Sequence, residues 1–349
     1  MDKLCAFANL YKAHKKARLG KRDLKEIIEF EMNLSWHLVT LADALRNGSY
    51  RLSGYYQFPV FDPKPRIISA LHYRDRVVQH CLCDEIIAPE LDKRLVYDNA
   101  ACRIGKGTLF AIHRVTHFLA DYYKHQGPDG YFLKCDIRKF FDNIDHEKLK
   151  AKLSQIFQEA GLVQLLHVII DSYETVPGKG LPLGNQTSQW FALYYLDEMD
   201  RLIKERLQIA YFSRYMDDMV LIHRDKSYLR YCLREMRALA DKLGLEFNAK
   251  TKIAPLRNGI DYLGFHFYLA ESGKIIRKVR QSTKKRCKKK LRYMRNAYAA
   301  GTMEATDIRQ VVASYRGHMQ HGHTWKLLRK LLGEGPLGLP ANIGFVKNP

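Results

Sequence analysis

The chain has 349 residues, of which 46% are hydrophobic and 27% are charged, a composition typical of a globular protein and not of a disordered one. Its 58 lysines and arginines exceed its 37 aspartates and glutamates and give a formal net charge of +21. A soluble protein this basic usually binds a polyanion, so nucleic acid and an anionic membrane surface are the leading candidates.

Several classes of protein are disfavoured. No run of about 18 apolar residues is present, which argues against a membrane span. The seven cysteines are scattered and odd in number, and no CxxC pair is present, which makes a zinc site or a disulfide framework unlikely. The first residues also lack the apolar core of a signal peptide. We therefore expect a cytoplasmic protein with reduced thiols.

Periodicity and turn residues predict a mixed chain of helices and short strands. The chain begins with helices over 2–46, broken near Gly20, then a strand–turn–strand over 54–70, a helix over 73–96, a loop over 98–107 and a helix to about Tyr123. The middle of the chain has a strand over 131–135, helices within 145–173, a Gly/Pro-rich loop over 177–184 and a helix over 186–206. Two strands around a tight turn over 209–222 follow, then a helix over 226–243, a short strand pair around YLGF and a helical tail. This order indicates an α+β fold whose small sheets are interrupted by helices.

The positive charge is concentrated near the C-terminal end. Lys274 to Arg295 holds twelve basic and no acidic residues. Because no acidic partner lies four positions away, the like charges would destabilise an isolated helix, and an anionic partner would relieve the repulsion. A solvated helix face is the alternative, and contact with nucleic acid is the interpretation that we favour. A second, weaker basic stretch runs from Lys12 to Lys25.

Three aspartates lie at the ends of predicted strands. Asp217 and Asp218 follow Tyr-Met between the apolar segments IAYFSR and MVLIH, and Asp136 ends the apolar strand 131–135. Adjacent carboxylates repel each other, so they need a cation or an exposed turn, and a helix N-cap is the alternative role for Asp136. Two strands of one sheet could bring the three together as ligands for two Mg²⁺ ions, which in phosphoryl-transfer sites lie roughly 3.5–4 Å apart.

These segments resemble the ordered motifs of reverse transcriptases. CDIRKFFDNIDH is similar to the first catalytic motif of that family and YMDD to the second. The other similar segments, all within about 55–270, are Lys64-Pro65-Arg66 and Arg74 to Gln79 in the fingers, Asn99 to Gly105, Gly180 to Gln189, Leu243 to Thr251, and Tyr262-Leu263-Gly264 in the primer grip.

The resemblance implies a right-hand polymerase fold with a small antiparallel palm sheet and a helical thumb. The implied domains are an N-terminal helical extension over 1–50, fingers over 51–130, a palm over 131–270 with a finger insertion at about 147–185, and a basic helical thumb over 271–349. The implied activity is RNA-directed DNA synthesis, with template RNA, a cDNA primer strand and dNTPs as partners and no membrane.

The resemblance also implies roles for individual residues. The implied ligands for two Mg²⁺ ions, or for Mn²⁺ as a substitute, are Asp136, Ile137, Asp217 and Asp218. The implied general acid is Lys250, and Lys252 is an alternative because it lies as near in the sequence. The implied nucleotide-binding residues are Lys64, Arg66, Arg103, Phe141, Leu183, Gly184 and Gln189, of which Phe141 would block a ribose 2′-hydroxyl or, alternatively, pack in the core. The implied primer and template contacts are Tyr215, Met216, Tyr262, Leu263, Gly264, Lys284, Lys285, Arg286, Lys288 and Lys289.

One departure from the family pattern indicates which kind of reverse transcriptase the chain resembles. Most reverse transcriptases have Gln-Gly and then Ser-Pro in the loop–helix motif, where this chain has Leu183 and Gln189 in place of the Gln and the Pro. The resulting LGNQTSQ resembles the enzymes of diversity-generating retroelements, which copy a template RNA with errors at adenines and act with a small basic accessory protein. An antiviral-defence or retron-like enzyme and a catalytically silent nucleic-acid-binding scaffold are the alternatives, and the intact aspartates argue against the scaffold.

Overall fold

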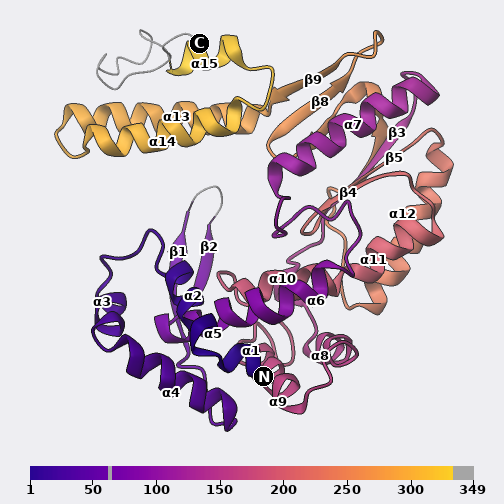
Figure 1. Cartoon of the computed structure of the whole chain (residues 1–349). Coiled ribbons are helices and arrows are strands. Elements are labelled where there is room, and N and C mark those ends of the chain that lie inside the picture. Colours follow the sequence, from indigo (N-terminus) through magenta and orange to yellow (C-terminus); the bar gives the residue numbers. More distant parts are fainter. Residues whose placement is uncertain (62–64, 333–349) are drawn as a thin grey trace. The chain divides into compact units, whose positions relative to one another are not determined.

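The computed structural model describes residues 1–61 and 65–332, and these form two compact units. Unit 1 comprises Met1–Gly107, Cys135–Met219 and Arg230–Thr251, and unit 2 comprises Thr108–Lys134, Val220–Leu229 and the chain from Lys252 onward. Figure 1 labels the elements along the chain. The mixed helix and sheet content with small antiparallel sheets confirms the predicted α+β class.

The first part of unit 1 is a layer of helices followed by a hairpin. The helices are α1 (Asp2–Cys5), α2 (Phe7–Ala17), α3 (Lys25–Met32) and α4 (Leu34–Arg46), and the hairpin pairs β1 (Tyr55–Val60) with β2 (Arg66–Leu71). α2 packs on α5 (Tyr73–Leu82), where the buried Tyr73 hydroxyl lies 2.8 Å from His14 Nδ1. The break near Gly20 and the strand–turn–strand were both predicted correctly.

The other helices of unit 1 surround the loops that carry the motifs. They are a π-helical turn (Cys83–Ile87), α6 (Ala88–Asp92), a 3₁₀ turn (Phe141–Asn143), α8 (His146–Ser154), α9 (Ala160–Asp171), α10 (Gln186–Tyr195), α11 (Asp197–Arg201) and a second π-helical turn (Leu202–Arg206). Asp145 caps α8, because its side chain accepts a hydrogen bond of 3.0 Å from the backbone N–H of Lys148. The capping role that was the alternative for Asp136 thus belongs to Asp145 in the structure.

A four-stranded sheet has the strand order β4-β5-β3-β6. Its strands are β3 (Tyr131–Cys135), β4 (Tyr211–Tyr215), β5 (Asp218–His223) and β6 (Lys252–Pro255), and β3 and β6 are antiparallel with Leu133 opposite Ile253. β5 is followed by α12 (Lys226–Lys242). The middle residues of β4 and β5 are buried, which explains why both segments are apolar in the sequence.

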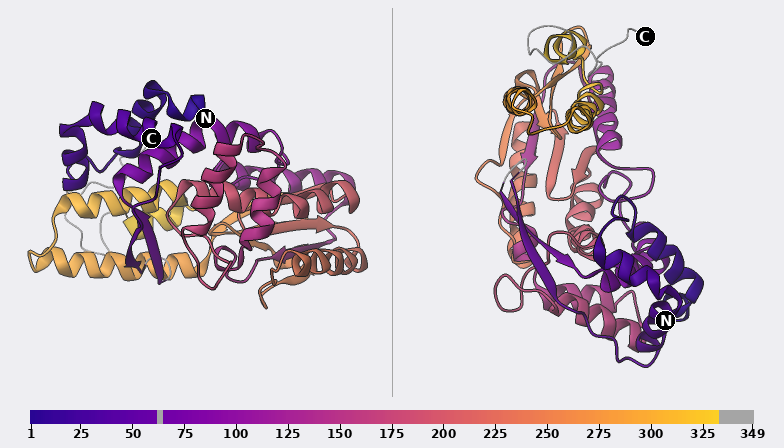
Figure 2. Two further views of the ribbon diagram at one scale, coloured as in Figure 1. Left: turned by 90° about the horizontal axis from the view of Figure 1, so that it is seen from below. Right: turned by 90° about the vertical axis from the view of Figure 1, so that its left-hand side faces the viewer.

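Unit 2 contains a three-stranded antiparallel sheet and a set of helices. The strands are β7 (Ile260–Tyr262), β8 (Phe265–Leu269) and β9 (Ile275–Val279), and the helices are α7 (Thr108–Gln126), α13 (Gln281–Ala299), α14 (Ala305–Met319) and α15 (Trp325–Leu332). α13 and α14 run side by side in both views of Figure 2. None of the helices in 1–61 or 65–332 is long and apolar enough to cross a membrane.

The basic segment is divided between two elements. Lys274 to Val279 lies in and before β9, and only the part from Gln281 onward is helical. The apolar residues of this segment therefore lie in two different elements. Val279 packs in the sheet of unit 2, whereas Cys287, Leu291 and Met294 form the buried stripe of α13.

Candidate active site

The turn between β4 and β5 carries two of the three aspartates. β4 ends at Tyr215 and β5 begins at Asp218, so Met216 and Asp217 alone make the turn. Met216 has a φ of +56°. This left-handed conformation costs an L-residue other than glycine about 1–2 kcal/mol, so the surrounding structure must hold it in place.

A buried arginine holds this turn from behind. Arg214 is completely buried, and its guanidinium Nη1 donates a hydrogen bond of 2.9 Å to the backbone carbonyl of Met216. A second nitrogen, Nη2, donates to the carbonyl of Leu193 at 3.0 Å. The arginine thus fixes the carbonyl of the residue directly before Asp217.

Arg214 is fixed in turn by a carboxylate. Its Nε and Nη2 each lie 2.6 Å from an oxygen of Asp200, which is also fully buried, so the pair is a bidentate ion pair. Burial raises the pKa of the Asp200 carboxyl, and the Arg214 guanidinium opposes this shift by stabilising the charged form. The amide of Asn99 lies 3.4 Å from the same carboxyl group.

Asp136 follows β3 directly, and its backbone is paired with the segment after α12. The Asp136 carbonyl accepts a hydrogen bond of 2.7 Å from the N–H of Asn248, and Ile137 forms a bridge with Phe247. Because β3 and β5 are neighbours in the sheet, Asp136 and the Met216–Asp217 turn are at the ends of adjacent strands. Ile137 is 2% exposed, so its side chain belongs to the core.

Lys250 is tied to the same segment. Its backbone N–H donates to the side-chain Oδ1 of Asn248 at 3.0 Å, while the N–H of Asn248 binds the carbonyl of Asp136. Lys250 is exposed, as the role of a proton donor to substrate requires. Lys252, the alternative, lies in β6 opposite Lys134 and is also exposed.

The three aspartates supply hard oxygen ligands of the kind that Mg²⁺ prefers. All three are half-buried. Across residues 1–61 and 65–332, however, no group of three or more His, Cys, Asp or Glu side chains is arranged closely enough to hold a metal ion. The donor chemistry therefore fits a divalent ion, whereas the carboxylates are not gathered into a ligand cluster.

The loop before α10 lies against the β1–β2 hairpin. The carbonyl of Leu183 accepts a hydrogen bond of 3.0 Å from the N–H of Ser69 in β2. Gly184 has a φ of +128°, and a Cβ there would lie 3.1 Å from Ile68 Cγ2 and 3.2 Å from the carbonyl oxygen of Ser69. A glycine is therefore required at 184 by conformation and by close approach. The Leu183 side chain is half-buried.

A groove of about 490 Å³ lies between this loop and the hairpin. Its lining includes Tyr56, Phe58, Ile68, Gly184, Gln186 and Gln189. Tyr56 and Phe58 are 42% and 41% exposed and their rings are stacked with a centroid distance of 6.0 Å. Gln189 accepts a hydrogen bond from the thiol of Cys102.

The other predicted nucleotide ligands differ in their surroundings. Arg66 begins β2 and is exposed, and Lys64 lies outside the described residues. Phe141 is half-buried and packs edge-to-face on Phe140, at a centroid distance of 5.6 Å. Phe140 is 3% exposed, so it is the core member of this pair and Phe141 is the one accessible to a ligand.

The Arg103 side chain is held by neighbouring residues of unit 1. Its side chain is 7% exposed and lies 2.5 Å from an oxygen of Asp92. Its other nitrogens donate to the backbone carbonyls of Asp92, Val96 and Asn99. Binding a triphosphate would break these contacts, so the structure favours a role in fixing the loop between α6 and α7.

The predicted primer grip is a tight hairpin turn in unit 2. Leu263 and Gly264 join β7 to β8 with φ values of +45° and +87°, the combination that two-residue turns of type I′ require. A Cβ on Gly264 would lie 2.8 Å from His318 Nε2. Tyr262 is 1% exposed, so its side chain belongs to the core.

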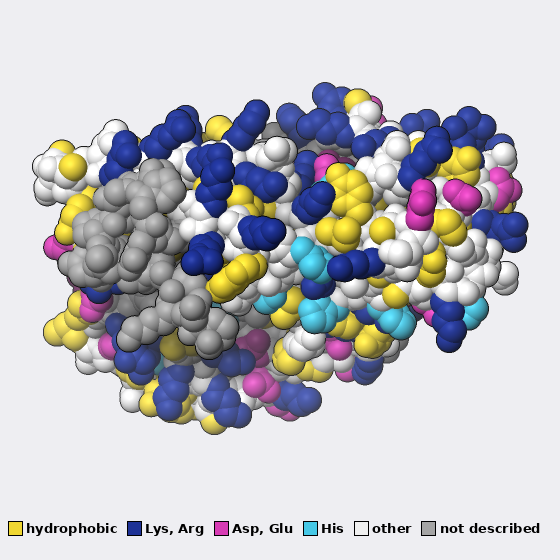
Figure 3. All heavy atoms as spheres, turned by 90° about the horizontal axis from the view of Figure 1, so that it is seen from above, with side chains coloured by type: hydrophobic (Ala, Val, Ile, Leu, Met, Phe, Trp, Pro, Cys, Tyr) yellow, Lys and Arg dark blue, Asp and Glu magenta, His cyan; other side chains and the backbone are white. Residues whose placement is uncertain are grey.

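The cations of α13 are on its solvent-facing sides. Thr283, Cys287, Leu291 and Met294 form the buried stripe, and Lys285, Arg286, Lys288 and Lys289 are exposed around it, with Lys284 half-buried. Figure 3 shows one face of the molecule on which Lys and Arg side chains clearly outnumber Asp and Glu. The cations of α13 are thus available to a polyanion.

The sequence analysis missed Arg214 and Asp200. The available signal was an arginine within the apolar segment IAYFSRY, because a charged residue in a buried strand needs a buried partner. The partner, Asp200, lies on α11 and belongs to no motif, so its role was not evident before the structure was known.

Known proteins are similar to this chain in fold and in sequence pattern. The structure of telomerase from Candida albicans in complex with a TWJ fragment of telomeric RNA matches with a TM-score of 0.50 and 13% identity, over 86% of this chain and 62% of that one. Apo telomerase from Candida tropicalis, truncated from the C-terminal domain, matches with a TM-score of 0.48 and 14% identity, over 70% of this chain and 60% of that one.

This chain spans about 60% of the length of these telomerase chains. A family model described as reverse transcriptase (RNA-dependent DNA polymerase) matches residues 61–267, more than half of the chain, and includes all three aspartates. The chain therefore belongs to the reverse transcriptase family.

Proposed function

We propose that the chain is an RNA-directed DNA polymerase that extends a cDNA primer on a template RNA with dNTPs. The observation that carries this proposal is the placement of Asp136 directly after β3 and of Asp217 and Asp218 at the β4–β5 turn, at the ends of neighbouring strands. The same residues lie within the region that the family model matches.

Asp136, Asp217 and Asp218 would hold two Mg²⁺ ions, together with the backbone of Ile137. Bound there, Mg²⁺ would lower the pKa of the primer 3′-hydroxyl and stabilise the charge that develops on the phosphates. The carboxylates would have to turn toward one another, because they are not clustered in the present arrangement. Arg214 would keep the turn in place while they do so, since it binds the carbonyl of Met216.

The chain's other residues would bind and orient the substrates. Arg66 would bind the triphosphate, since a guanidinium can contact two phosphate oxygens at once. Phe141 would exclude a ribose 2′-hydroxyl. Lys250 would donate a proton to the departing pyrophosphate, from an exposed position fixed by Asn248.

The direct test is primer extension. Wild-type protein, Asp217→Ala and the control Asp241→Asn, an exposed carboxylate on α12, are given a DNA primer on an RNA template with dNTPs. We expect extension by the wild type and the control with Mg²⁺, none after chelation, and none by Asp217→Ala. Equal extension by Asp217→Ala would reject the assignment, and no extension by the wild type would favour a catalytically silent scaffold.

We further propose that the enzyme belongs to a diversity-generating retroelement and acts with a small basic accessory protein. The support is LGNQTSQ at 183–189, in which Leu183 offers no polar group where most of the family has Gln. Weaker checking of the nascent base pair would then raise errors at template adenines. A genomic neighbourhood with a repeat pair that differs at adenines, beside a small basic gene, would support this subtype; its absence would favour an antiviral-defence or retron-like enzyme.

A further inference from the structure

α2 has an exposed face that the proposed polymerase site does not use. Phe7 and Tyr11, one helical turn apart, are 45% and 36% exposed. Their rings are nearly parallel, with an interplanar angle of 11° and a centroid distance of 6.4 Å. Aromatic side chains that remain in water as a pair on one helix face are a common mark of a binding surface.

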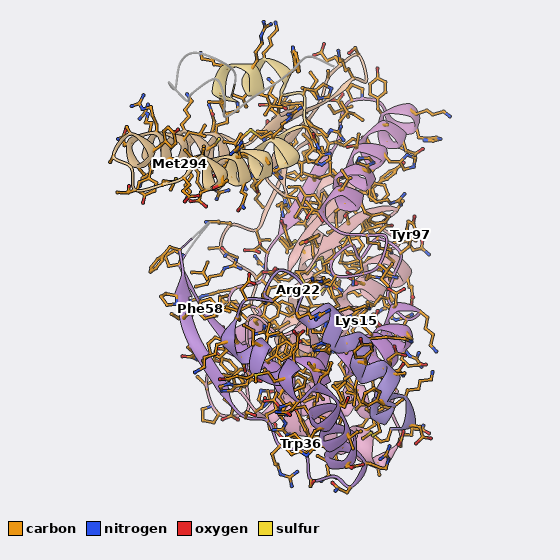
Figure 4. All side chains as sticks on the ribbon, turned by 60° about the vertical axis from the view of Figure 1, so that its left-hand side comes forward. Lys15, Arg22, Trp36, Phe58, Tyr97 and Met294 are labelled. Carbon is orange, nitrogen blue, oxygen red and sulfur yellow. The ribbon has the colours of Figure 1, made fainter. Side chains whose placement is uncertain are left out.

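Two lysines flank these rings. Lys12 and Lys15 are exposed on the same side of α2, opposite the buried stripe of Leu10, Ala13, His14 and Ala17. The ammonium of Lys15 lies 4.5 Å from the centroid of the Tyr11 ring. We call Phe7, Tyr11, Lys12 and Lys15 the α2 face; Lys15 is labelled in Figure 4.

The charge of the α2 face is not neutralised within unit 1. Neighbouring cations have carboxylate partners: Lys16 lies 2.7 Å from Asp84, and Arg18 lies 2.5 Å from Glu31. Among residues 1–61 and 65–332, no carboxylate is within ion-pair distance of Lys12 or Lys15. This is the weaker basic stretch of the sequence, and its free cations lie beside the aromatic pair.

The α2 face is also rigid. The buried His14 ring stacks on the Tyr11 ring at a centroid distance of 6.1 Å. Its Nδ1 lies 2.8 Å from the Tyr73 hydroxyl of α5, and the Phe30 ring of α3 stacks on it at 6.0 Å. A ligand on the α2 face would therefore bind a surface that is already ordered and would not have to pay the entropy of folding it.

We propose that the α2 face binds single-stranded RNA at a site separate from the polymerase site. Unstacked bases would pack on the Phe7 and Tyr11 rings, and the ammonium groups of Lys12 and Lys15 would contact phosphates. Duplex RNA fits less well, because its bases are already stacked and cannot reach the rings. Naming RNA as the strand rests on the proposed function, since the strand would belong to the template molecule.

This site would increase the concentration of the template near the enzyme. A template held at the α2 face and in the polymerase site has two attachments, so its affinity exceeds that of the polymerase site alone. This gain in affinity would grow with the length of the single-stranded RNA until that RNA can reach both sites. Blunt primed duplexes would not benefit.

The test compares two primed RNA templates, one blunt and one with a single-stranded RNA extension of about 16 nucleotides, near the upper end of single-strand site sizes. Affinities are measured for the full-length wild type and for Tyr11→Leu/Lys15→Gln. The matched control is Trp36→Leu/Arg46→Gln, which also removes one exposed aromatic ring and one exposed cation, both from α4.

We expect the wild type and the control to bind the extended template about tenfold more tightly than the blunt one, the effect of one stacked base. The Tyr11/Lys15 variant should lose this difference and bind the blunt template normally. Ultraviolet crosslinking of 4-thiouridine in the extension should label the Phe7–Lys15 region in the wild type.

An unchanged advantage in the Tyr11/Lys15 variant, or an equal loss in the control, would overturn the proposal. So would a variant that loses binding only to phosphatidylserine vesicles, because the α2 face would then bind an anionic membrane. Extension of the primer on the extended template, whose single-stranded part serves as the template, is measured in the same samples. If the wild type fails to extend the primer while preferring the extended template, the proposed function fails and the α2 site stands.

Discussion

The carboxylate turn of unit 1 and helix α13 of unit 2 differ in where their charged side chains lie, buried and paired behind the turn but exposed on the helix. At the turn, a fully buried ion pair of Arg214 and Asp200 fixes the backbone beside Asp217. On α13 most of the cations surround a buried stripe and lie in solvent. Reaction chemistry requires charges at fixed positions, whereas binding a phosphate backbone requires only charge density.

This contrast predicts that the turn is sensitive to single substitutions and that α13 is not. A buried ion pair fails when one partner is removed, because the other charge is left unpaired in a low-dielectric interior. An exposed cation is replaced by water and salt, so its removal has a graded effect. The following changes range from the largest expected effect to the smallest.

Asp136→Asn should nearly abolish nucleotide incorporation. Losing several kcal/mol of metal-dependent stabilisation corresponds to a rate decrease of about 10³-fold, at tenfold per 1.36 kcal/mol. Single-turnover incorporation with Mg²⁺ is the measurement. The free energy of unfolding should not fall, because one of three mutually repelling carboxylates is removed; a large loss of stability would mean that Asp136 has a structural role.

Arg214→Met should destabilise the fold by about 3–5 kcal/mol, because it leaves the Asp200 carboxylate buried without its partner. Urea unfolding measures this. The double variant Arg214→Met/Asp200→Leu should regain much of the loss, but its incorporation rate should stay low because nothing then binds the Met216 carbonyl. A double variant with full activity would show that the arginine is needed only for stability.

Replacing Lys285, Lys288 and Lys289 with Gln should weaken template–primer binding without changing the rate of the bound complex. If each lysine neutralises one phosphate, the slope of log affinity against log salt should decrease by about 2 to 3. Affinity measured at several salt concentrations gives this slope. A changed single-turnover rate with an unchanged slope would place these cations in the chemistry and break the contrast with the turn.

Leu183→Gln should have the smallest effect on rate and should act on fidelity. Restoring a polar side chain at 183 should lower misincorporation opposite template adenine, since geometric checking of the base pair would improve. Sequencing of cDNA made by both proteins on one template gives the error frequency at each base. An unchanged frequency at adenine would remove Leu183 as the cause.

The sequence predicted the elements that local signals specify. The hairpin turns at 216–217 and 263–264 follow from short breaks between apolar strands, and the Asp145 cap follows from its place before a helix. Residues that depend on distant partners were not predictable. The carbonyls that bind Arg103 have no sequence signature, and the burial of Tyr262 comes from tertiary packing.

The aspartates themselves were predictable by type and order, because carboxylates at strand ends need a cation. Their distances were not, since the final ligand geometry depends on side-chain rotamers and on the ion. The Arg214–Asp200 ion pair that supports the turn was predictable only in part. The arginine was visible in an apolar strand, but Asp200 on α11 could be found only from the fold.

The central claim is that Asp136, Asp217 and Asp218 together bind the divalent ions of a polymerase. It is tested most directly by counting Mn²⁺ ions, by electron paramagnetic resonance, in a complex of the protein with an RNA template, a chain-terminated primer and the matching dNTP. We predict that the wild type and Asp241→Asn bind two ions per complex and that Asp217→Asn binds fewer. The same number of ions, bound with the same affinity, in Asp217→Asn would contradict the account.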